Sequence, residues 1–241
     1  MRTVYRAVRG EYTEKKSRFI ADLFYIESEE EAEAALARVR KEFYDARHHC
    51  SAFIISRKND AAAAEAGAAQ KKAQGNAPSP GSQMILRSSD DGEPQGTAGH
   101  PMLDVLTSAG LVNVLAVVTR YFGGTLLGTG GLVRSYTKAL QDALEKSIII
   151  ERKNGIPLTV TADYTAIGKL EYFFAKEELP ALSKEYGENV KETLLIPEER
   201  LSQVQNEITQ LTGGKAGMSA GNAIEYAVLD GTVLTGEALL D

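Results

Sequence analysis

The order of apolar and polar positions along the chain predicts a mixed α/β protein. Period-two or continuous apolar runs rich in β-branched and aromatic residues are typical of strands, and apolar residues three and four apart are typical of helices. In the first part of the chain these patterns predict strands at 4–8, 18–26, 48–56, 84–88 and 111–122, and helices at 28–46, 101–108 and 131–146. The first two strands are expected to pair as a hairpin across the polar turn 10–17.

Two of these elements carry specific signals. Ser28 followed by Glu31 forms a capping box at the start of the first helix. The run 111–122 is almost continuously β-branched, which indicates a central strand covered on both faces.

After Gly155 the pattern starts again and predicts a second domain. Its elements are expected in the order strand, helix, strand, strand, helix, strand, at 156–164, 165–177, 180–186, 189–197, 198–212 and 223–230. This βαββαβ order is the ferredoxin-like arrangement. We therefore expect an N-terminal domain over 1–153 and a C-terminal domain over 154–241. The alanine-rich tract 57–83 lacks an apolar stripe that could dock it firmly and is interpreted as a mobile insertion.

Composition narrows the class of protein. The 241 residues are 43% hydrophobic and 25% charged, as in soluble globular proteins. A single cysteine excludes an internal disulfide and fits the reducing cytosol, so a cytoplasmic location is expected. No secretory signal is evident, and no apolar stretch reaches the roughly 20 residues that span a bilayer, so no membrane role is expected.

Charge is divided unevenly between the two predicted domains. Residues 1–155 hold 21 Lys and Arg against 19 Asp and Glu, a net of +2, whereas residues 156–241 hold 6 against 14, a net of −8. A polyanion such as RNA would therefore be met by the N-terminal part, because phosphate neutralisation supplies most non-specific nucleic-acid affinity. A solvated acidic domain joined to a neutral one explains the same counts.

The segment RYFGGTLLGTGGLVRSY, 120–136, places five glycines between a strand and a helix. Glycines there allow backbone N–H groups to approach an anion at the helix N-terminus. Neither the P-loop nor the dinucleotide-binding pattern is met, and a purely structural turn remains the alternative. The candidate anion-binding or RNA-binding residues are Arg120, Gly123, Gly124, Gly128, Gly130, Gly131 and Arg134. Arg120 has a second interpretation, an ion pair with Asp90, Asp91 or Glu93.

A second candidate segment is DDGEPQGTAG, 90–99, which holds three carboxylates within four positions. Carboxylates so close together could hold a hard cation or act as acid and base, although Asp-Gly and Glu-Pro are also ordinary turn formers. Thr97 is a candidate helix cap. On a strand, His48 and Cys50 would lie roughly 7 Å apart, too far for direct proton transfer, and Cys50 is interpreted as a small buried hydrophobe. The other candidate surface residues are His48, Cys50, Asp91, Glu93, Thr97, His100 and Tyr121. No metal site and no cofactor are assigned.

Three segments resemble the IMPACT/YigZ family in order and spacing: ARHHC at 46–50, DDGEPQGTAGHPML at 90–103 and NVLAVVTRYFGGTLLGTGGLVRSY at 113–136. The resemblance implies an α+β fold, with an N-terminal left-handed βαβ domain like that of a small-subunit ribosomal protein and of domain IV of elongation factor G. It implies a C-terminal domain like domain V of that factor. It also implies a link to translational control.

Three hypotheses follow for function. The first is a translation-linked regulatory protein that binds RNA or a ribosome-associated factor through its N-terminal domain. The second is a metal-dependent hydrolase or phosphotransferase that uses the DDGEP turn and the glycine loop. The third is a protein-docking module anchored by Tyr121, Phe122 and Tyr136, although these aromatics also suit a core. The oligomeric state stays open.

Overall fold

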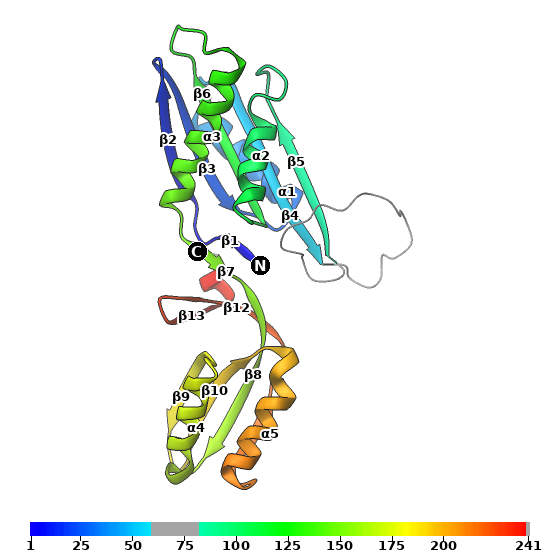
Figure 1. The fold of residues 1–241 in the computed structure, drawn as a ribbon, viewed down its shortest axis with the longest axis vertical. Helices are drawn as coiled ribbons and strands as arrows, with labels where there is room; N and C mark the ends of the chain where they lie inside the picture. The colour runs from blue at the N-terminus through cyan, green and yellow to red at the C-terminus, as the bar shows by residue number, and fades with distance from the viewer. Residues whose placement is uncertain (59–81, 240–241) are drawn as a thin grey trace, which may run out of the picture. The chain divides into compact units, whose positions relative to one another are not determined.

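The computed structural model describes residues 1–58 and 82–239. It divides the chain into two compact units, Met1–Ile149 and Ile150–Asp241 (Figure 1). The division lies close to the boundary expected between residues 153 and 154. Most of the tract interpreted as a mobile insertion, residues 59–81, lies outside the described residues, and its two ends belong to strands. No helix in the described ranges is both long enough and apolar enough to cross a bilayer.

The N-terminal unit is an antiparallel five-stranded sheet with helices on both faces. The strand order is β2 (Val8–Glu14), β3 (Ser17–Tyr25), β6 (Val114–Tyr121), β4 (His48–Lys58) and β5 (Ser82–Ser89). Helix α1 (Glu29–Glu42) packs on one face, and α2 (Gly99–Ser108) and α3 (Gly128–Lys146) pack on the other (Figure 1). A short strand, β1 (Arg2–Val4), precedes them. As predicted, β6 lies at the centre, and every residue except Tyr121 is buried.

The first hairpin differs from the prediction. Residues 5 and 6 form a bend, and most of the predicted polar turn is strand β2. The turn consists of Lys15 and Lys16 alone, with φ of 47° and 65°, values that match the twist of a two-residue hairpin. The prediction was wrong because β2 is an edge strand, and only one of its faces is packed by a helix. Such a strand can carry polar side chains on its other face and then resembles a turn in sequence.

Helix α1 begins as predicted. The Ser28 side chain accepts a 3.1 Å hydrogen bond from the Glu31 backbone N–H, and the Glu31 carboxylate accepts one of 2.8 Å from the Glu27 N–H. The first bond satisfies an amide that a helix start would otherwise leave without an acceptor, and the second ties Glu31 to the chain just before the helix.

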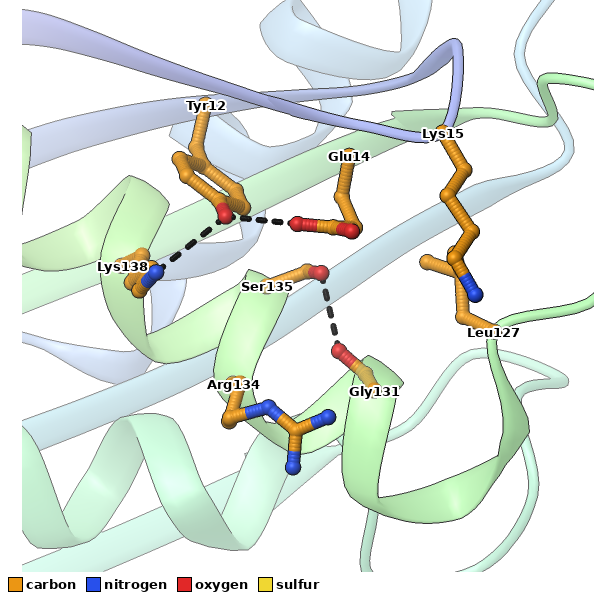
Figure 2. Close-up of a pocket in the computed structure, with 8 residues that line it drawn as sticks. All are labelled: Tyr12, Glu14, Lys15, Leu127, Gly131, Arg134, Ser135 and Lys138. Carbon is orange, nitrogen blue, oxygen red and sulfur yellow. Dashed lines mark hydrogen bonds between the residues drawn. The ribbon is translucent and has the colours of Figure 1, made fainter.

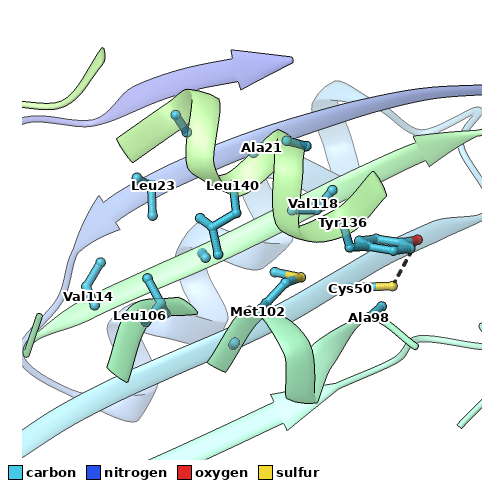
Figure 3. Close-up of a cluster of buried hydrophobic side chains, with 14 of the residues drawn as sticks. Ala21, Leu23, Cys50, Ala98, Met102, Leu106, Val114, Val118, Tyr136 and Leu140 are labelled. Atoms are coloured by element: carbon cyan, nitrogen blue, oxygen red, sulfur yellow. Dashed lines mark hydrogen bonds between the residues drawn. The ribbon is translucent and has the colours of Figure 1, made fainter. Parts of the chain in front are cut away.

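The main core lies between the sheet and the α2–α3 layer (Figure 3). Helix α3 approaches β2 closely because Gly10 has no side chain. A Cβ at Gly10 would lie 2.3 Å from the Ala143 backbone nitrogen. The glycine in this strand therefore serves close packing and not a turn.

The C-terminal unit is also a helix-covered antiparallel sheet. Strand β7 (Ile149–Glu151) spans the division between the two units. The elements that follow it are β8 (Lys153–Ala162), α4 (Tyr164–Lys176), β9 (Ala181–Tyr186), β10 (Val190–Ile196), α5 (Leu201–Thr212), β11 (Gly217–Ala220), β12 (Ile224–Leu229) and β13 (Thr232–Thr235). The sheet order is β13-β12-β8-β10-β9, and β11 also pairs with β8. The expected elements are all present. Sequence reasoning missed β11 and β13, which have four residues each and lack a clear apolar alternation.

Candidate anion-binding site

The glycine segment forms a loop and the first turn of α3. The helix begins at Gly128, three residues earlier than predicted, so Gly128, Gly130 and Gly131 belong to it. No side chain caps this end of the helix. The first N–H groups of a helix have no acceptor within the helix, and together they carry the positive end of its dipole. An uncapped glycine-rich start therefore leaves amides available to an anion.

The earlier glycines of this segment have structural roles. A Cβ at Gly123 would lie 2.1 Å from the Lys16 carbonyl carbon, and the Gly123 N–H donates to Ser17 Oγ at 3.0 Å. Gly124 has a φ of 83°, in the left-handed region that favours glycine. Gly123 packs the loop against the β2–β3 hairpin, and Gly124 permits the left-handed turn that follows, so the structural interpretation applies to both.

Arg120 forms the ion pair that was its second interpretation. Its Nη1 lies 2.5 Å from Glu93 Oε1, and the two side chains are only 7% and 3% exposed. The Tyr136 hydroxyl donates to the same Glu93 oxygen at 2.9 Å. The Arg120 guanidinium also lies 5.5 Å from the Phe19 ring centroid. Arg120 is therefore committed to the interior and does not face a ligand at the surface.

Asp90 caps helix α2, a role that the sequence suggested for Thr97. Its carboxylate accepts hydrogen bonds of 2.7 to 2.9 Å from the backbone N–H groups of Gly96, Ala98 and Gly99. Thr97 instead donates its hydroxyl to a carbonyl of the same turn at 2.6 Å. Burial opposes ionisation of Asp90, but the three amides outweigh it and lower its pKa. Sequence reasoning missed this role because the cap comes from outside the helix.

The other polar candidates do not converge on one point. Asp91 binds the Arg40 guanidinium at 2.9 Å and accepts the His49 backbone N–H at 2.7 Å. His48 Nδ1 lies 2.9 Å from the Asp91 carbonyl oxygen, and His100 is exposed on α2. Across residues 1–58 and 82–239, no group of three or more His, Cys, Asp or Glu side chains is placed to hold a metal ion.

Cys50 is buried beside Tyr136, in agreement with its interpretation as a small hydrophobe (Figure 3). Its Sγ lies 3.0 Å from the Asp90 carbonyl oxygen and 3.3 Å from the Tyr136 hydroxyl oxygen. Burial raises the pKa of the thiol to about 12. Cys50 is therefore neutral at physiological pH and is not an activated nucleophile.

The aromatic candidates divide between the core and the surface. Tyr136 is fully buried, whereas Phe122 is 56% exposed. The Tyr121 hydroxyl donates to Asp45 Oδ1 at 2.7 Å, and its ring packs edge-on against Phe43. Burial and the Asp45 carboxylate raise the pKa of Tyr121 to about 12. Of the three proposed docking anchors, only Phe122 is exposed.

A cavity of about 110 Å³ opens beside the first turn of α3 (Figure 2). Its lining consists of Tyr12, Glu14, Lys15, Leu127, Gly131, Arg134, Ser135 and Lys138. Figure 2 shows Lys15 and Arg134 extending toward this turn from two different elements. Three of the lining side chains are cationic, and all three are exposed.

The charged groups in this cavity are held in part by Tyr12. Its hydroxyl donates to Glu14 Oε2 at 2.7 Å, and the Lys138 ammonium donates to that hydroxyl at 3.2 Å. The Arg134 guanidinium packs against the first turn of α3, since its Nη1 would lie 3.4 Å from a Cβ at Gly130. The i,i+4 spacing of Arg134 and Lys138 could have revealed this pair in the sequence. Lys15 could not be found there, because the hairpin register brings it to the cavity.

The fold and the site define a class: a two-unit α/β protein whose N-terminal unit carries a small cationic cavity at a helix start. The family model described as the Impact N-terminal domain matches residues 15–144, and a domain of unknown function, DUF1949, matches residues 160–215. The chain belongs to the IMPACT family.

Curated relatives cover nearly the whole chain. It is 35% identical over 219 residues to "IMPACT family member YvyE" of Bacillus subtilis (strain 168), covering 91% of this chain and 90% of that protein. It is 33% identical over 201 residues to "IMPACT family member YigZ" of Escherichia coli (strain K12), covering 83% and 87%. A crystal structure described only as that of a hypothetical protein overlaps with a TM-score of 0.51 at 30% identity, covering 92% and 97%.

Proposed function

We propose that this chain is a translation-linked regulatory protein that binds RNA through the cationic cavity of its N-terminal unit. RNA on the ribosome or free RNA would present the same phosphate groups. Membership of the IMPACT family supports the translational link, since the resemblance to that family implies it. The observation that carries the binding proposal is that three cationic side chains line one cavity together with Gly131, in the first turn of an uncapped helix.

The charges in the cavity favour an anion. Lys15, Arg134 and Lys138 face a single carboxylate, Glu14, and one of its oxygens already accepts a bond from Tyr12. Arginine can bind two phosphate oxygens at once through its planar guanidinium, and lysine adds a mobile point charge. The helix start supplies amides for further hydrogen bonds. A phosphate group fits all three contributions.

The hydrolase or phosphotransferase hypothesis gains no observation in its favour. The carboxylates that it requires are engaged elsewhere: Asp91 pairs with Arg40 and accepts the His49 N–H, and Glu93 neutralises a buried arginine. We therefore advance no second function.

We extend the proposal to the fold type of each unit. The C-terminal order β8-α4-β9-β10-α5-β11, with sheet neighbours β11-β8-β10-β9, supports a ferredoxin-like domain. In the N-terminal unit, β3 and β4 both run antiparallel to β6, so the β3-α1-β4 connection joins parallel strands. We propose that this crossover is left-handed, as the family resemblance implies.

Fluorescence anisotropy with a labelled single-stranded RNA and a labelled RNA hairpin, at 50 to 300 mM salt, tests the binding proposal. The Arg134→Ala/Lys138→Ala variant should bind about tenfold more weakly at the lowest salt. Its log–log salt slope should be lower by about 1 to 2, because each phosphate contact contributes about 0.7 to 0.9. Lys169→Ala/Lys176→Ala, which removes two exposed lysines from the C-terminal unit, is the charge-matched control and should bind normally. Equal losses in both variants, or affinity that does not respond to salt, would refute the proposal.

A further inference from the structure

Exposed aromatic side chains gather on one side of the C-terminal unit. Four tyrosines of the described chain are exposed, and three of them lie on α4 and β9: Tyr164 at 57%, Tyr172 at 75% and Tyr186 at 70%. Leu182 on β9 is 38% exposed. We call these four residues the tyrosine surface. Contiguous exposed aromatics are unusual on a surface without a partner and mark an interaction site.

Contacts place Tyr164 beside β9 and join α4 to β9 at the residue before Tyr172. The Tyr164 hydroxyl donates to the Gly187 carbonyl at 2.9 Å, which places its ring beside the end of β9. Helix α4 and strand β9 lie next to each other (Figure 1), and Glu171 of α4 pairs with Lys184 of β9. Tyr186 has the same strand parity as Lys184, so both lie on the face that α4 covers, and Leu182 lies at the register shift between β9 and β10.

The backbone beside this surface is also accessible. Strand β9 is at the end of the sheet order, and β10 is the strand that it pairs with among the described residues. Five of its six residues are exposed. An edge strand with an unpaired row of N–H and C=O groups can accept an extended segment from another chain.

Charge identifies the kind of segment that would fit. The region 156–241 holds 6 Lys and Arg against 14 Asp and Glu. Asp163 adjoins Tyr164, and Glu188 lies two residues beyond Tyr186; both carboxylates belong to exposed residues. The same charge disfavours nucleic acid, since a polyanion would be repelled.

The tyrosine surface already shows how it would receive a cation. The Lys184 ammonium lies 5.6 Å from the centroid of the Tyr186 ring, within cation–π range. Tyr186 remains 70% exposed despite this contact. Tyrosine rings beside carboxylates are well suited to lysine and arginine side chains, because the ring face and the carboxylate both attract the cation.

We propose that the tyrosine surface and the edge of β9 bind an extended, lysine- and arginine-rich segment of a partner protein. The segment would lie along β9, with its cations against Tyr172, Tyr186 and the neighbouring carboxylates. This site is separate from the RNA-binding cavity and is independent of that proposal.

Fluorescence anisotropy of the full chain with a labelled 12-residue peptide of alternating Lys or Arg and Ser tests the proposal. A peptide with Glu at each basic position is the charge control and should not bind. The Tyr172→Ala/Tyr186→Ala variant should bind the basic peptide at least fivefold more weakly, since an exposed cation–π contact is worth about two- to fivefold in affinity. Both side chains are largely exposed, so the fold should be retained, and circular dichroism checks this.

Matched single variants test whether the peptide binds at the tyrosine surface. Glu188→Lys should weaken peptide binding, whereas Glu199→Lys at the far end of β10 should not; both residues are exposed. Tyr44→Ala removes a tyrosine that is 84% exposed in the other unit and should have no effect. Equal effects of the two charge reversals, or unchanged peptide affinity in the tyrosine double variant, would overturn the proposal.

Two other binding partners of the tyrosine surface, RNA and a second copy of this chain, would give different results in these experiments. If the tyrosine double variant lowers RNA affinity and leaves peptide affinity intact, the occupant is RNA and the proposal fails. If it abolishes self-association in sedimentation velocity without changing peptide affinity, the surface joins two copies of this chain, and the proposal also fails. Loss of RNA binding in Arg134→Ala/Lys138→Ala with normal peptide binding would support two separate sites.

Discussion

Replacing Arg120 with methionine should destabilise the N-terminal unit by about 3 to 5 kcal/mol, because it leaves the Glu93 carboxylate buried without its counter-charge. The Arg120 and Glu93 side chains are 7% and 3% exposed and 2.5 Å apart, so solvent screens this pair little. The Tyr136 hydroxyl would remain as a neutral donor to Glu93. One such hydrogen bond cannot replace a guanidinium in an apolar interior.

The double variant Arg120→Met/Glu93→Gln separates the charge effect from the loss of packing. Removing both charges eliminates the unpaired carboxylate, so the double variant should be more stable than the sum of the two single losses predicts. We expect a coupling of about 1 to 3 kcal/mol, as for contacting residues in one polar network.

Hydrogen exchange measured by mass spectrometry on peptides from β6 and from residues 90–99 reports on the N-terminal unit alone. This local measurement avoids assigning one unfolding free energy to a chain of two units. A loss below about 1 kcal/mol in Arg120→Met, or strict additivity in the cycle, would refute a buried, coupled pair. If that variant kept its stability but lost RNA affinity, Arg120 would belong to the ligand surface after all.

Asp90→Asn should weaken the start of α2 by about 1 to 3 kcal/mol, measured by exchange of amides 96–102, because it removes the charge that caps three N–H groups. The pKa of Asp90 is lower in the folded than in the unfolded protein. The stability that Asp90 contributes is therefore fully present above the unfolded pKa of about 3.9 and is lost as pH falls through the folded pKa. Wild type should lose more stability in acid than Asp90→Asn does, and equal losses would contradict the cap. Cys50 should react with a thiol reagent at pH 8 at least a hundredfold more slowly in the folded protein than in urea, because burial raises its pKa to about 12; comparable rates would show that the thiol is accessible. Gly10→Ala should cost about 1 to 3 kcal/mol, measured by hydrogen exchange of peptides from β2 and α3, since its Cβ would meet the Ala143 backbone at 2.3 Å. A neutral result would mean that α3 can move away from β2.

Strong local patterns gave most of the fold. The capping box predicted α1, the β-branched run predicted the buried β6, and the restart after Gly155 predicted the second unit. The errors occurred where a local pattern has two meanings. The edge strand β2 was interpreted as a turn because its polar residues face solvent, and the short strands β11 and β13 lack enough residues to show a period.

The candidate site was less predictable. Sequence reasoning selected the glycine segment, part of which lines the cavity, and the carboxylate segment, which does not line it, but it could not assign the partners of their side chains. Arg120 and Arg134 look alike in sequence, yet Arg120 is buried against Glu93 and Arg134 lines the cavity. The difference depends on whether a position lies on the central strand or on the open side of a helix.

By itself, the sequence determined the order of elements, the two-unit organisation, the acidic second half and the glycine-rich helix start, because each depends on residues close together in the chain. Tertiary structure alone decided that Lys15 joins Arg134 and Lys138, that Asp90 caps α2, and that three exposed tyrosines of the C-terminal unit lie on the adjacent elements α4 and β9. The physical reason is that hydrogen bonding, charge pairing and burial depend on distance in space, and strand register and helix packing set that distance.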